Sequence, residues 1–223
     1  MSDNLTCELL INLIDFSLNS VLTSDDERRH IGNLISFLIL RVNYGRDFEQ
    51  QLSFYVDARG SFPNLDSVLH TLVSCVNKLS MDTRQIVKGN HTRKTAAFVK
   101  ACAAFSFITI PSIISTTHRL DLYLYTGEVA LANICLGQAD ACLEAALNLL
   151  PELPKMLDVD GRQRSSEFYL QSYVSKFLAF LIVVPVSLKV LIRRKILILG
   201  FSGFPSTRCT LSPSTSARKN QRI

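Results

Sequence analysis

The sequence has 223 residues, of which 48% are apolar and none is tryptophan, and its formal net charge is +5. A chain of this length and apolar content can bury a sizeable core or a run of stacked helix pairs, which excludes a disordered polymer as a description of the whole. Residues 185–223 hold eight basic residues and no acid, which leaves 16 basic against 19 acidic residues in the remainder. The body is therefore mildly acidic, and nothing in its charge supports nucleic-acid binding.

The cysteine and histidine positions argue against a metal centre or a catalytic site. Six cysteines are scattered along the chain without a C-x-x-C pair: Cys7, Cys75, Cys102, Cys135, Cys142 and Cys209. We expect reduced, buried thiols of a cytosolic protein rather than a disulfide frame or a zinc site. None of the histidines (His30, His70, His91 and His118) has an acid or nucleophile at motif distance, and the chain has no phosphate-binding or hydrolase motif. The sequence therefore predicts no enzyme and no cofactor.

Apolar residues recur at helical spacing in the first half of the chain, and strand-like alternation is almost absent. We expect a helix over about 5–22 and a second one that starts at the capping box Ser24–Glu27 and ends near Gly45 as its C′ residue. Its stripe consists of Ile31, Leu34, Ile35, Leu38 and Val42. A third helix covers about 46–58, with Gly60 and Pro63 as breaks after it.

The middle of the chain predicts two more helices separated by a loop. The fourth carries Leu65, Leu69, Leu72, Val76 and Leu79, and residues 81–91 are expected to form the longest interior loop. Thr92 caps the fifth helix, which Pro111 ends. We expect Ala97, Ala101, Phe105 and Ile108 to form its packing face, since small residues allow a neighbouring helix to approach closely.

One segment favours a solenoid over a closed bundle. A sixth helix is expected over about 117–136, a seventh over about 138–150, and an eighth from about 166 after a polar loop that contains Gly161. Seven residues of this segment have the spacings of a tetratricopeptide-type hairpin: Tyr123, Gly127, Ala130, Ala139, Leu143, Ala146 and Pro151. No second copy occurs at the same period. The sequence therefore predicts an all-α solenoid of antiparallel hairpins, of HEAT or tetratricopeptide type, followed by an irregular tail.

Long ordered strings of the sequence carry a resemblance to a known family. They are Ile31–Ile35, Phe48–Asp57, His91–Cys102, Phe107–Ser112, Leu120–Leu124, Gly127–Asn133 and Gln138–Ala141. Together they resemble the C-terminal part of the large scaffold subunit of the endosomal retriever complex, which is the paralogue of the retromer scaffold. The resemblance covers about residues 1–184, which we take as the solenoid. Residues 185–223 are unlike the family, and we expect this basic tail to be poorly ordered.

The resemblance implies a non-catalytic scaffold that is cytoplasmic and peripheral on endosomes, where it supports recycling of cargo to the plasma membrane. The implied partners are a small subunit with a metallophosphoesterase fold, shared by retromer and retriever, and the coiled-coil proteins of the larger Commander assembly. An arrestin-like subunit binds the N-terminal solenoid of the family, so we do not expect this chain to bind it. Neither nucleic acid nor a cofactor is implied, and the membrane is met only peripherally.

Two exposed segments are the candidate partner-binding residues. Asn90, His91, Arg93 and Lys94 lie at a helix start, where the helix dipole disfavours cations, so that an acidic partner would explain them. A plainer interpretation of these four residues is a solvated first helical turn without a partner. Asp121 and Tyr125 form the second set of candidate residues. An alternative function rests on the apolar and basic segment 177–201, which could anchor the chain in a membrane or lie on its surface.

Overall fold

The computed structural model describes Ile11 and residues 25–159 and 162–183, which form seven α-helices, two short 3₁₀ helices and one β-hairpin. The helices are α2 (Asp25–Arg41), α3 (Phe48–Ser61), α4 (Asp66–Ile86), α5 (Arg93–Thr109), α6 (Thr116–Ala132), α7 (Leu136–Leu149) and α8 (Glu167–Val183). The 3₁₀ helices η1 (Ile110–Ser112) and η2 (Leu150–Glu152) follow α5 and α7. The helix expected over 5–22, apart from Ile11, and the tail 185–223 lie outside the described residues.

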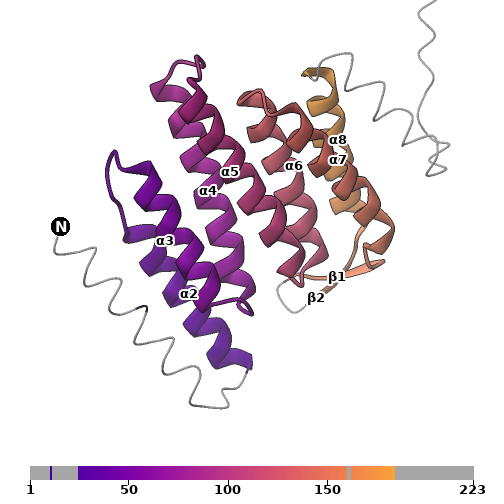
Figure 1. The fold of residues 1–223 in the computed structure, drawn as a ribbon. Coiled ribbons are helices and arrows are strands. Elements are labelled where there is room, and N and C mark those ends of the chain that lie inside the picture. Colours follow the sequence, from indigo (N-terminus) through magenta and orange to yellow (C-terminus); the bar gives the residue numbers. More distant parts are fainter. Residues whose placement is uncertain (1–10, 12–24, 160–161, 184–223) are drawn as a thin grey trace, which may run out of the picture.

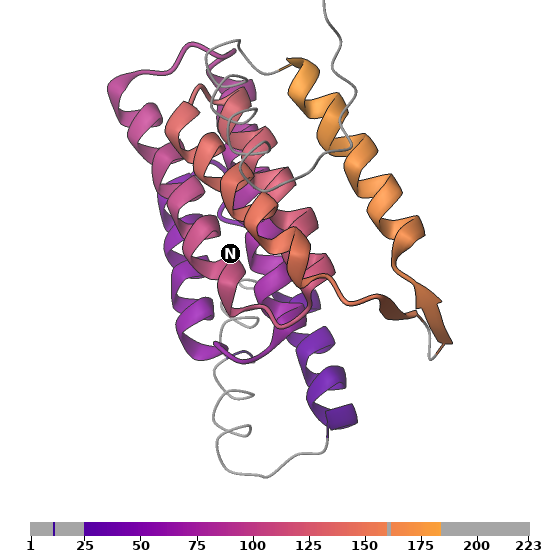
Figure 2. The same ribbon diagram turned by 90° about the vertical axis from the view of Figure 1, so that its right-hand side faces the viewer.

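The helices pack in two layers. Helices α2, α4, α6 and α8 contact one another in that order, and α3, α5 and α7 form the second layer on top of them. Consecutive helices run antiparallel across the layers, so that the stack advances by one hairpin at a time (Figure 1). Helix α8 lies at the far edge, after the β-hairpin (Figure 2). This repeated pairing of neighbours is the arrangement of an α-solenoid, as the sequence predicts.

Helices α6 and α7 pack along each other as the hairpin that the residue spacing indicates. Tyr123 and Ala130 on α6 and Ala139, Leu143 and Ala146 on α7 are all at most 4% exposed. Small residues on both sides let the two backbones approach each other closely. Pro151 lies in η2 directly after α7, and therefore marks the end of the hairpin as expected.

Two apolar cores are stacked along the molecule, and α4 contributes to both. The N-terminal core joins α2, α3 and α4 through Ile35, Ile39, Phe54, Tyr55, Val68, Leu72 and Val76. The C-terminal core joins α4, α6, α7 and α8 through Leu69, Val73, Leu120, Leu124, Leu143, Tyr173 and Phe177. Because two adjacent sides of α4 face the two cores, this helix connects the two halves of the stack.

A small set of buried polar side chains fixes three helices at the centre. The Asn77 side-chain amide on α4 donates to Thr126 Oγ1 on α6 at 2.9 Å, and Ser106 Oγ on α5 donates to Asn77 Oδ1 at 3.3 Å. All three residues are at most 1% exposed. A buried polar group needs its partners at defined positions, so this triad sets how far α5 and α6 lie along α4.

Helix ends differ from the expectation at three places. The loop expected over residues 81–91 is shorter, since α4 continues to Ile86, and Arg84 Nε donates to the Ala132 carbonyl at 2.8 Å, which stabilises this last turn. The prediction of Gly45 as C′ residue of the second helix is wrong. Helix α2 ends at Arg41, and Gly45 adopts a left-handed φ of 65° in the turn before Asp47, which caps α3. Gly60 lies inside α3 rather than after it.

The expected packing face of α5 is also wrong. Ala97, Ala101 and Ile108 are exposed, whereas Val99, Cys102, Ala103, Ser106 and Thr109 are buried. The hydroxyl groups of Ser106 and Thr109 give this side of the helix a polar sequence pattern. It can nevertheless be buried, because Ser106 Oγ donates to Asn77 Oδ1 and Thr109 Oγ1 donates to the Phe105 carbonyl at 2.7 Å within the helix. The small apolar residues therefore form an outer stripe. Thr92 caps the helix as predicted, with its side chain accepting from the Thr95 amide.

The polar segment before α8 forms a β-hairpin that the sequence analysis does not foresee. Strand β1 (Met156–Val159) pairs antiparallel with β2 (Arg162–Ser165), with Met156 opposite Ser165 and Leu157 opposite Arg164. The two strands lead into α8, which turns back along α6 (Figure 2). The Tyr169 hydroxyl donates to the Thr117 carbonyl at 2.9 Å and ties the start of α8 to the start of α6.

Candidate partner-binding surfaces

The basic residues at the start of α5 meet an acidic side chain of the chain itself. Lys94 Nζ lies 2.9 Å from Glu49 Oε1 on α3, and this carboxylate raises the pKa of the Lys94 ammonium. The ion pair offsets the unfavourable placement of Lys94 at the positive end of the helix dipole. Both side chains are well exposed, so the pair contributes little to stability. Arg93 is exposed beside it.

Asn90 and His91 lie in the connection between α4 and α5, and this connection is at the top of the view in Figure 1. His91 lines a concavity of about 440 Å³ together with Lys100 and with the α6–α7 connection at Ile134 and Cys135. Both ring nitrogens of His91 are shielded from solvent and have no hydrogen-bond partner among the described residues. Asn90 is exposed, and its backbone amide closes a turn on the Val87 carbonyl at 2.9 Å.

Asp121 and Tyr125 lie elsewhere, on the exposed face of α6 between α4 and α8. Asp121 Oδ1 is 3.8 Å from Lys176 Nζ on α8, so this carboxylate helps to hold α8 in place. Tyr125 is 39% exposed, and burial of its remaining surface, together with the nearby Glu128 and Asp82, raises the pKa of its hydroxyl. The structure therefore does not bring the two predicted sets of residues together.

A larger concavity lies across the first three helices of the lower layer. We call it the α2–α4–α6 groove, and it has a volume of about 940 Å³. It is lined by Arg28, Arg29, Asn33, Ser36, Phe37 and Leu40 of α2, by Asn64, Leu65, Asp66, Ser67, His70 and Thr71 at the start of α4, and by Ile114, Ser115 and His118 at the start of α6. Because it crosses three helices of one layer, the groove lies on the broad face of the stack and not at its end.

The groove has an apolar floor and a cationic rim. Phe37, Leu40 and Ile114 are 52%, 64% and 83% exposed, which is unusual for large apolar side chains that lie side by side. Arg28 and Arg29 are exposed at the rim. A third cation stands over this floor, since the Arg41 guanidinium lies 4.8 Å from the centre of the Phe37 ring.

Asp66, the carboxylate that lines the groove, forms its hydrogen bonds within the groove wall. The Asp66 carboxylate accepts from the Ile114 amide at 3.1 and 3.0 Å and from the Ser115 amide at 3.3 Å. These bonds fix the α5–α6 connection to the start of α4 and thereby position Ile114. Beside it the His70 and His118 rings lie 5.1 Å apart, and burial together with the charge of His118 lowers the pKa of His70.

The local sequence pattern does not predict the groove as a whole, although α2 carries a signal for it. Leu34, Phe37 and Leu40 repeat at a spacing of three on a side of the helix that the buried residues Ile35 and Ile39 do not share. Two apolar sides on one helix indicate a second surface to be covered. The contribution of His118 and Ile114 has no comparable signal, because their approach to α2 depends on the stacking of the hairpins.

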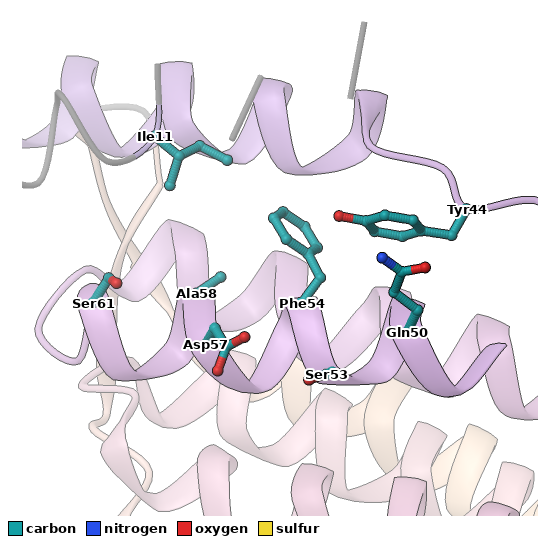
Figure 3. A pocket seen from close by; sticks show the side chains of 8 residues that line it. All are labelled: Ile11, Tyr44, Gln50, Ser53, Phe54, Asp57, Ala58 and Ser61. Atoms are coloured by element: carbon teal, nitrogen blue, oxygen red, sulfur yellow. The ribbon is translucent and has the colours of Figure 1, made fainter. Parts of the chain in front are cut away.

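A smaller concavity of about 310 Å³ lies along α3 (Figure 3). Ile11 and Tyr44 stand opposite the helix, with Gln50, Phe54 and Asp57 among the side chains on the α3 side. The Tyr44 and Phe54 rings are tilted against each other with centroids 6.2 Å apart. This mixture of one carboxylate, amide, hydroxyl and aromatic groups has no charge pair or nucleophile–base arrangement, so we assign it no chemistry.

The described residues contain no group of three or more histidine, cysteine or acidic side chains that could hold a metal ion. Cys75, Cys102, Cys135 and Cys142 are free thiols, as expected, and burial raises the pKa of each of them. Cys7 and Cys209 lie outside the described residues. Such thiols are packing groups rather than nucleophiles.

By length and composition alone, one helical stretch within the described part of the chain could cross a membrane, namely Arg93–Ser112. It packs between α4, α6, α3 and α7, and a core helix of a water-soluble protein meets the same criterion. The segment 177–201 considered above extends beyond the described residues from position 184 onward.

The fold defines an α-solenoid with broad faces, and comparison with known proteins gives its family. A model of the VPS35L C-terminal domain matches residues 3–193, and the chain belongs to this family. Relatives named "VPS35 endosomal protein-sorting factor-like" are 55% identical in Danio rerio and 54% identical in Homo sapiens, each over 166 residues and 74% of this chain. A relative in Drosophila melanogaster, "VPS35 endosomal protein sorting factor-like", is 48% identical over 193 residues and 82% of this chain.

The chain matches only 17–20% of the length of these relatives. The comparison confirms the resemblance to this family. The relatives are named as endosomal sorting factors, so the protein belongs to a sorting-factor family.

Proposed function

We propose that this chain is the C-terminal part of a scaffold subunit in an endosomal sorting complex of the retriever type. It works by holding partner subunits at fixed spacing on a rigid stack of hairpins and performs no chemistry of its own. The observation that carries the proposal is the family membership of residues 3–193, whose relatives are named as endosomal sorting factors. The continuous layer of α2, α4, α6 and α8 supports it, since such a layer offers a surface longer than one repeat.

In this proposal the partners are a small subunit with a metallophosphoesterase fold and the coiled-coil components of a Commander-type assembly. The complex acts in the cytoplasm, peripherally on endosomes, and returns cargo to the plasma membrane. The residues available for these contacts are the exposed Asn90 and Arg93, the half-buried His91, and Lys94, which is paired with Glu49. Asp121 and Tyr125 on α6 provide a second contact, near the ion pair with Lys176.

The test is direct association of the full chain with the purified small subunit. The two proteins are mixed and analysed by size-exclusion chromatography with light scattering, and we expect them to elute together in equal amounts. The coiled-coil components are then added in the same way. A folded chain that elutes apart from the small subunit and from the coiled-coil components would contradict the proposal.

Surface variants locate the contact within the stack. Tyr125→Glu places a charge on the exposed face of α6, and Asn90→Ala combined with His91→Ala changes the α4–α5 connection. Val56→Glu is the matched control for the first, because Val56 is 49% exposed on α3 in the other layer. We expect at least one of the two test variants, and not the control, to weaken the association, since changes on a surface away from the contact leave binding almost unchanged.

A further inference from the structure

We propose that the α2–α4–α6 groove binds a segment of a partner protein that presents a large apolar side chain next to carboxylates. The proposal concerns a surface that none of the residues considered for the small subunit lines, and it does not require that subunit to bind. Three features of the groove support the proposal, namely its shape, its apolar floor and the charge of its rim.

The shape is that of a site for one extended segment or one helical turn. A volume of about 940 Å³ is three times that of the concavity along α3, and it lies within the range that holds a ligand of drug-like size or a few side chains. The groove runs from α2 across the start of α4 to the start of α6. Its walls are anchored, because Asp66 holds the Ile114–Ser115 connection through three hydrogen bonds. A partner therefore meets a preformed surface.

The floor explains why the occupant must be partly apolar. Phe37, Leu40 and Ile114 leave most of their surface in water, and covering such groups releases free energy in proportion to the apolar area that is buried. The groove crosses three successive helices of the layer, so it is not the flat end at which another hairpin would stack. An incoming leucine- or phenylalanine-like side chain fits between Phe37 and Ile114.

The rim explains why the occupant must be acidic. Arg28 and Arg29 line the groove, and Arg41 lies over the Phe37 ring. No salt bridge of Arg28 or Arg29 is found among the side chains that the structure describes. Asp66, the carboxylate of the groove, already accepts hydrogen bonds from Ile114 and Ser115. The positive ends of the α2, α4 and α6 dipoles point to the same end of the stack (Figure 1), and they add to the attraction for an anion.

Glu27 precedes Arg28 in the first turn of α2, and a second acid close to the groove limits where the carboxylates of the partner can bind. Asp121 on α6 is near enough to His70 to counteract part of the lowering of its pKa by burial and His118, and it is paired with Lys176 at 3.8 Å. The side of the groove at α6 therefore repels a carboxylate more than the α2 side does. We infer that the segment lies with its acidic residues at Arg28 and Arg29 and with its apolar side chain toward Ile114 and His118.

Selection from a random peptide library tests this inference without knowledge of the natural partner. The biotinylated full chain is used to select peptides from a phage-displayed library, and the selected peptides are synthesised with a fluorophore for anisotropy titration. We expect them to share a net negative charge and at least one large aliphatic or aromatic residue. Selection of no peptide, or of peptides without acidic enrichment, overturns the proposal.

Two variants with matched controls assign the binding to the groove. The double variant Arg28→Glu, Arg29→Glu is compared with Arg162→Glu, Arg164→Glu, which makes the same charge change on the exposed strand β2. The apolar variant Leu40→Ser is compared with Val56→Ser on α3. We expect both groove variants to weaken peptide binding by about tenfold or more, and both controls to change it less than about threefold. Equal losses in variants and controls overturn the assignment.

Folding is checked on each variant by circular dichroism and by the melting temperature, and all six positions of the controls and variants are exposed enough to tolerate the change. Two other occupants are excluded in the same experiment. If a synthetic peptide of residues 1–24 of this chain binds the groove and displaces the selected peptides, the occupant is internal and the proposal is wrong. If vesicles with phosphatidylserine bind the chain through Arg28 and Arg29 while acidic peptides do not, a lipid surface is the partner and the proposal is likewise wrong.

Discussion

At the scale of single residues, the buried amide of Asn77 has a role that its chemistry rarely permits in a core. Its donor and acceptor are both used, by Thr126 and Ser106, and each partner comes from a different helix. A leucine at this position would bury more apolar area but would form no directional contact. The hydrogen bonds of the amide are satisfied only in one relative placement of α4, α5 and α6. Specificity of packing is therefore encoded by a polar residue in this core.

Asn77→Ala removes both hydrogen bonds and leaves a small cavity among buried groups. We expect it to lower the free energy of unfolding by about 2–4 kcal/mol, because the Thr126 and Ser106 hydroxyls lose their partner while they stay buried. Thermal unfolding followed by circular dichroism measures the effect. Ser53→Ala on the exposed side of α3 is the control and changes the stability by less than about 0.5 kcal/mol. A melting temperature of Asn77→Ala equal to that of the control would show that the triad has no structural role.

The buried thiols respond to alkylation in a way that reports on the fold. Burial raises the pKa of Cys102 and of Cys142 to about 12. At pH 8 the folded chain therefore holds roughly a thousandfold less thiolate at these positions than an unfolded chain, in which a cysteine has a pKa of about 8.5. We expect iodoacetamide to leave both residues unmodified in the native protein and to modify them in urea, as read by peptide mass mapping. Rapid modification without urea would contradict the packing of α5 and α7.

At the scale of elements, the α6–α7 hairpin is close but not as tight as its small residues indicate. A methyl group added at Gly127 would lie 3.6 Å from Cys142 Cβ and 3.7 Å from a Leu143 methyl, which are ordinary contact distances. A shorter contact would occur at Gly32, where an added methyl would meet Ser67 Oγ at 2.5 Å, so that this serine side chain would have to rotate.

This geometry predicts opposite effects for two substitutions at one position. Gly127→Ala raises the free energy of unfolding by about 0.5–1 kcal/mol, since alanine favours the helix and its methyl group fits. Gly127→Leu lowers it by about 1–3 kcal/mol through overpacking against α7. Gly137→Ala in the first turn of α7 is the control, because nothing lies within 4 Å of its added methyl group. Urea titration measures all three, and a destabilised Gly127→Ala variant would mean that the helices approach more closely than described.

The sequence predicts the order of the described helices well, because apolar stripes and caps are local signals. It predicts the α6–α7 hairpin by residue spacing, and every residue of that pattern except Pro151 is buried. It fails for the end of α4, which depends on the contact of Arg84 with α6, and for the buried face of α5, where hydroxyl groups are paired internally. The β-hairpin is missed although Asp160-Gly161 between two short runs is a strong turn signal.

The candidate site is less predictable than the fold for a physical reason. Asn90, His91, Arg93 and Lys94 are proposed from local charge, but the partner of Lys94 is Glu49, which is far away in the sequence. The α2–α4–α6 groove brings together side chains from three hairpins, and no local pattern encodes how these hairpins stack. The partner-binding role of Asp121 and Tyr125 stays a prediction.

At the scale of the whole molecule, stability is distributed over two cores that share one helix. In a stack of this kind each unit contacts only its neighbours, so local damage need not unfold the remainder. Ile35 belongs to the N-terminal core and Leu143 to the C-terminal core, and both are 0% exposed. The two cores can therefore be destabilised separately.

Hydrogen exchange measured by mass spectrometry tests this independence. We expect Ile35→Ala to speed exchange in α2 and α3 and to leave α6 and α7 protected, with a local loss of about 2–4 kcal/mol. Leu143→Ala should give the reverse pattern. The amides of α4 respond to both substitutions, because this helix faces both cores. Uniform acceleration along the chain in either variant would indicate a single cooperative unit instead.

The bonds of Asn77 also decide how the molecule behaves under load. Apolar contacts alone let neighbouring helices slide past one another by small steps, whereas a side-chain amide held by two hydroxyl groups resists sliding in both directions. We therefore expect α4, α5 and α6 to keep their relative positions when the stack is deformed. A force applied at α2 should then rotate α6, α7 and α8 together instead of sliding them along α4, so that it changes the angle between the two ends of the stack.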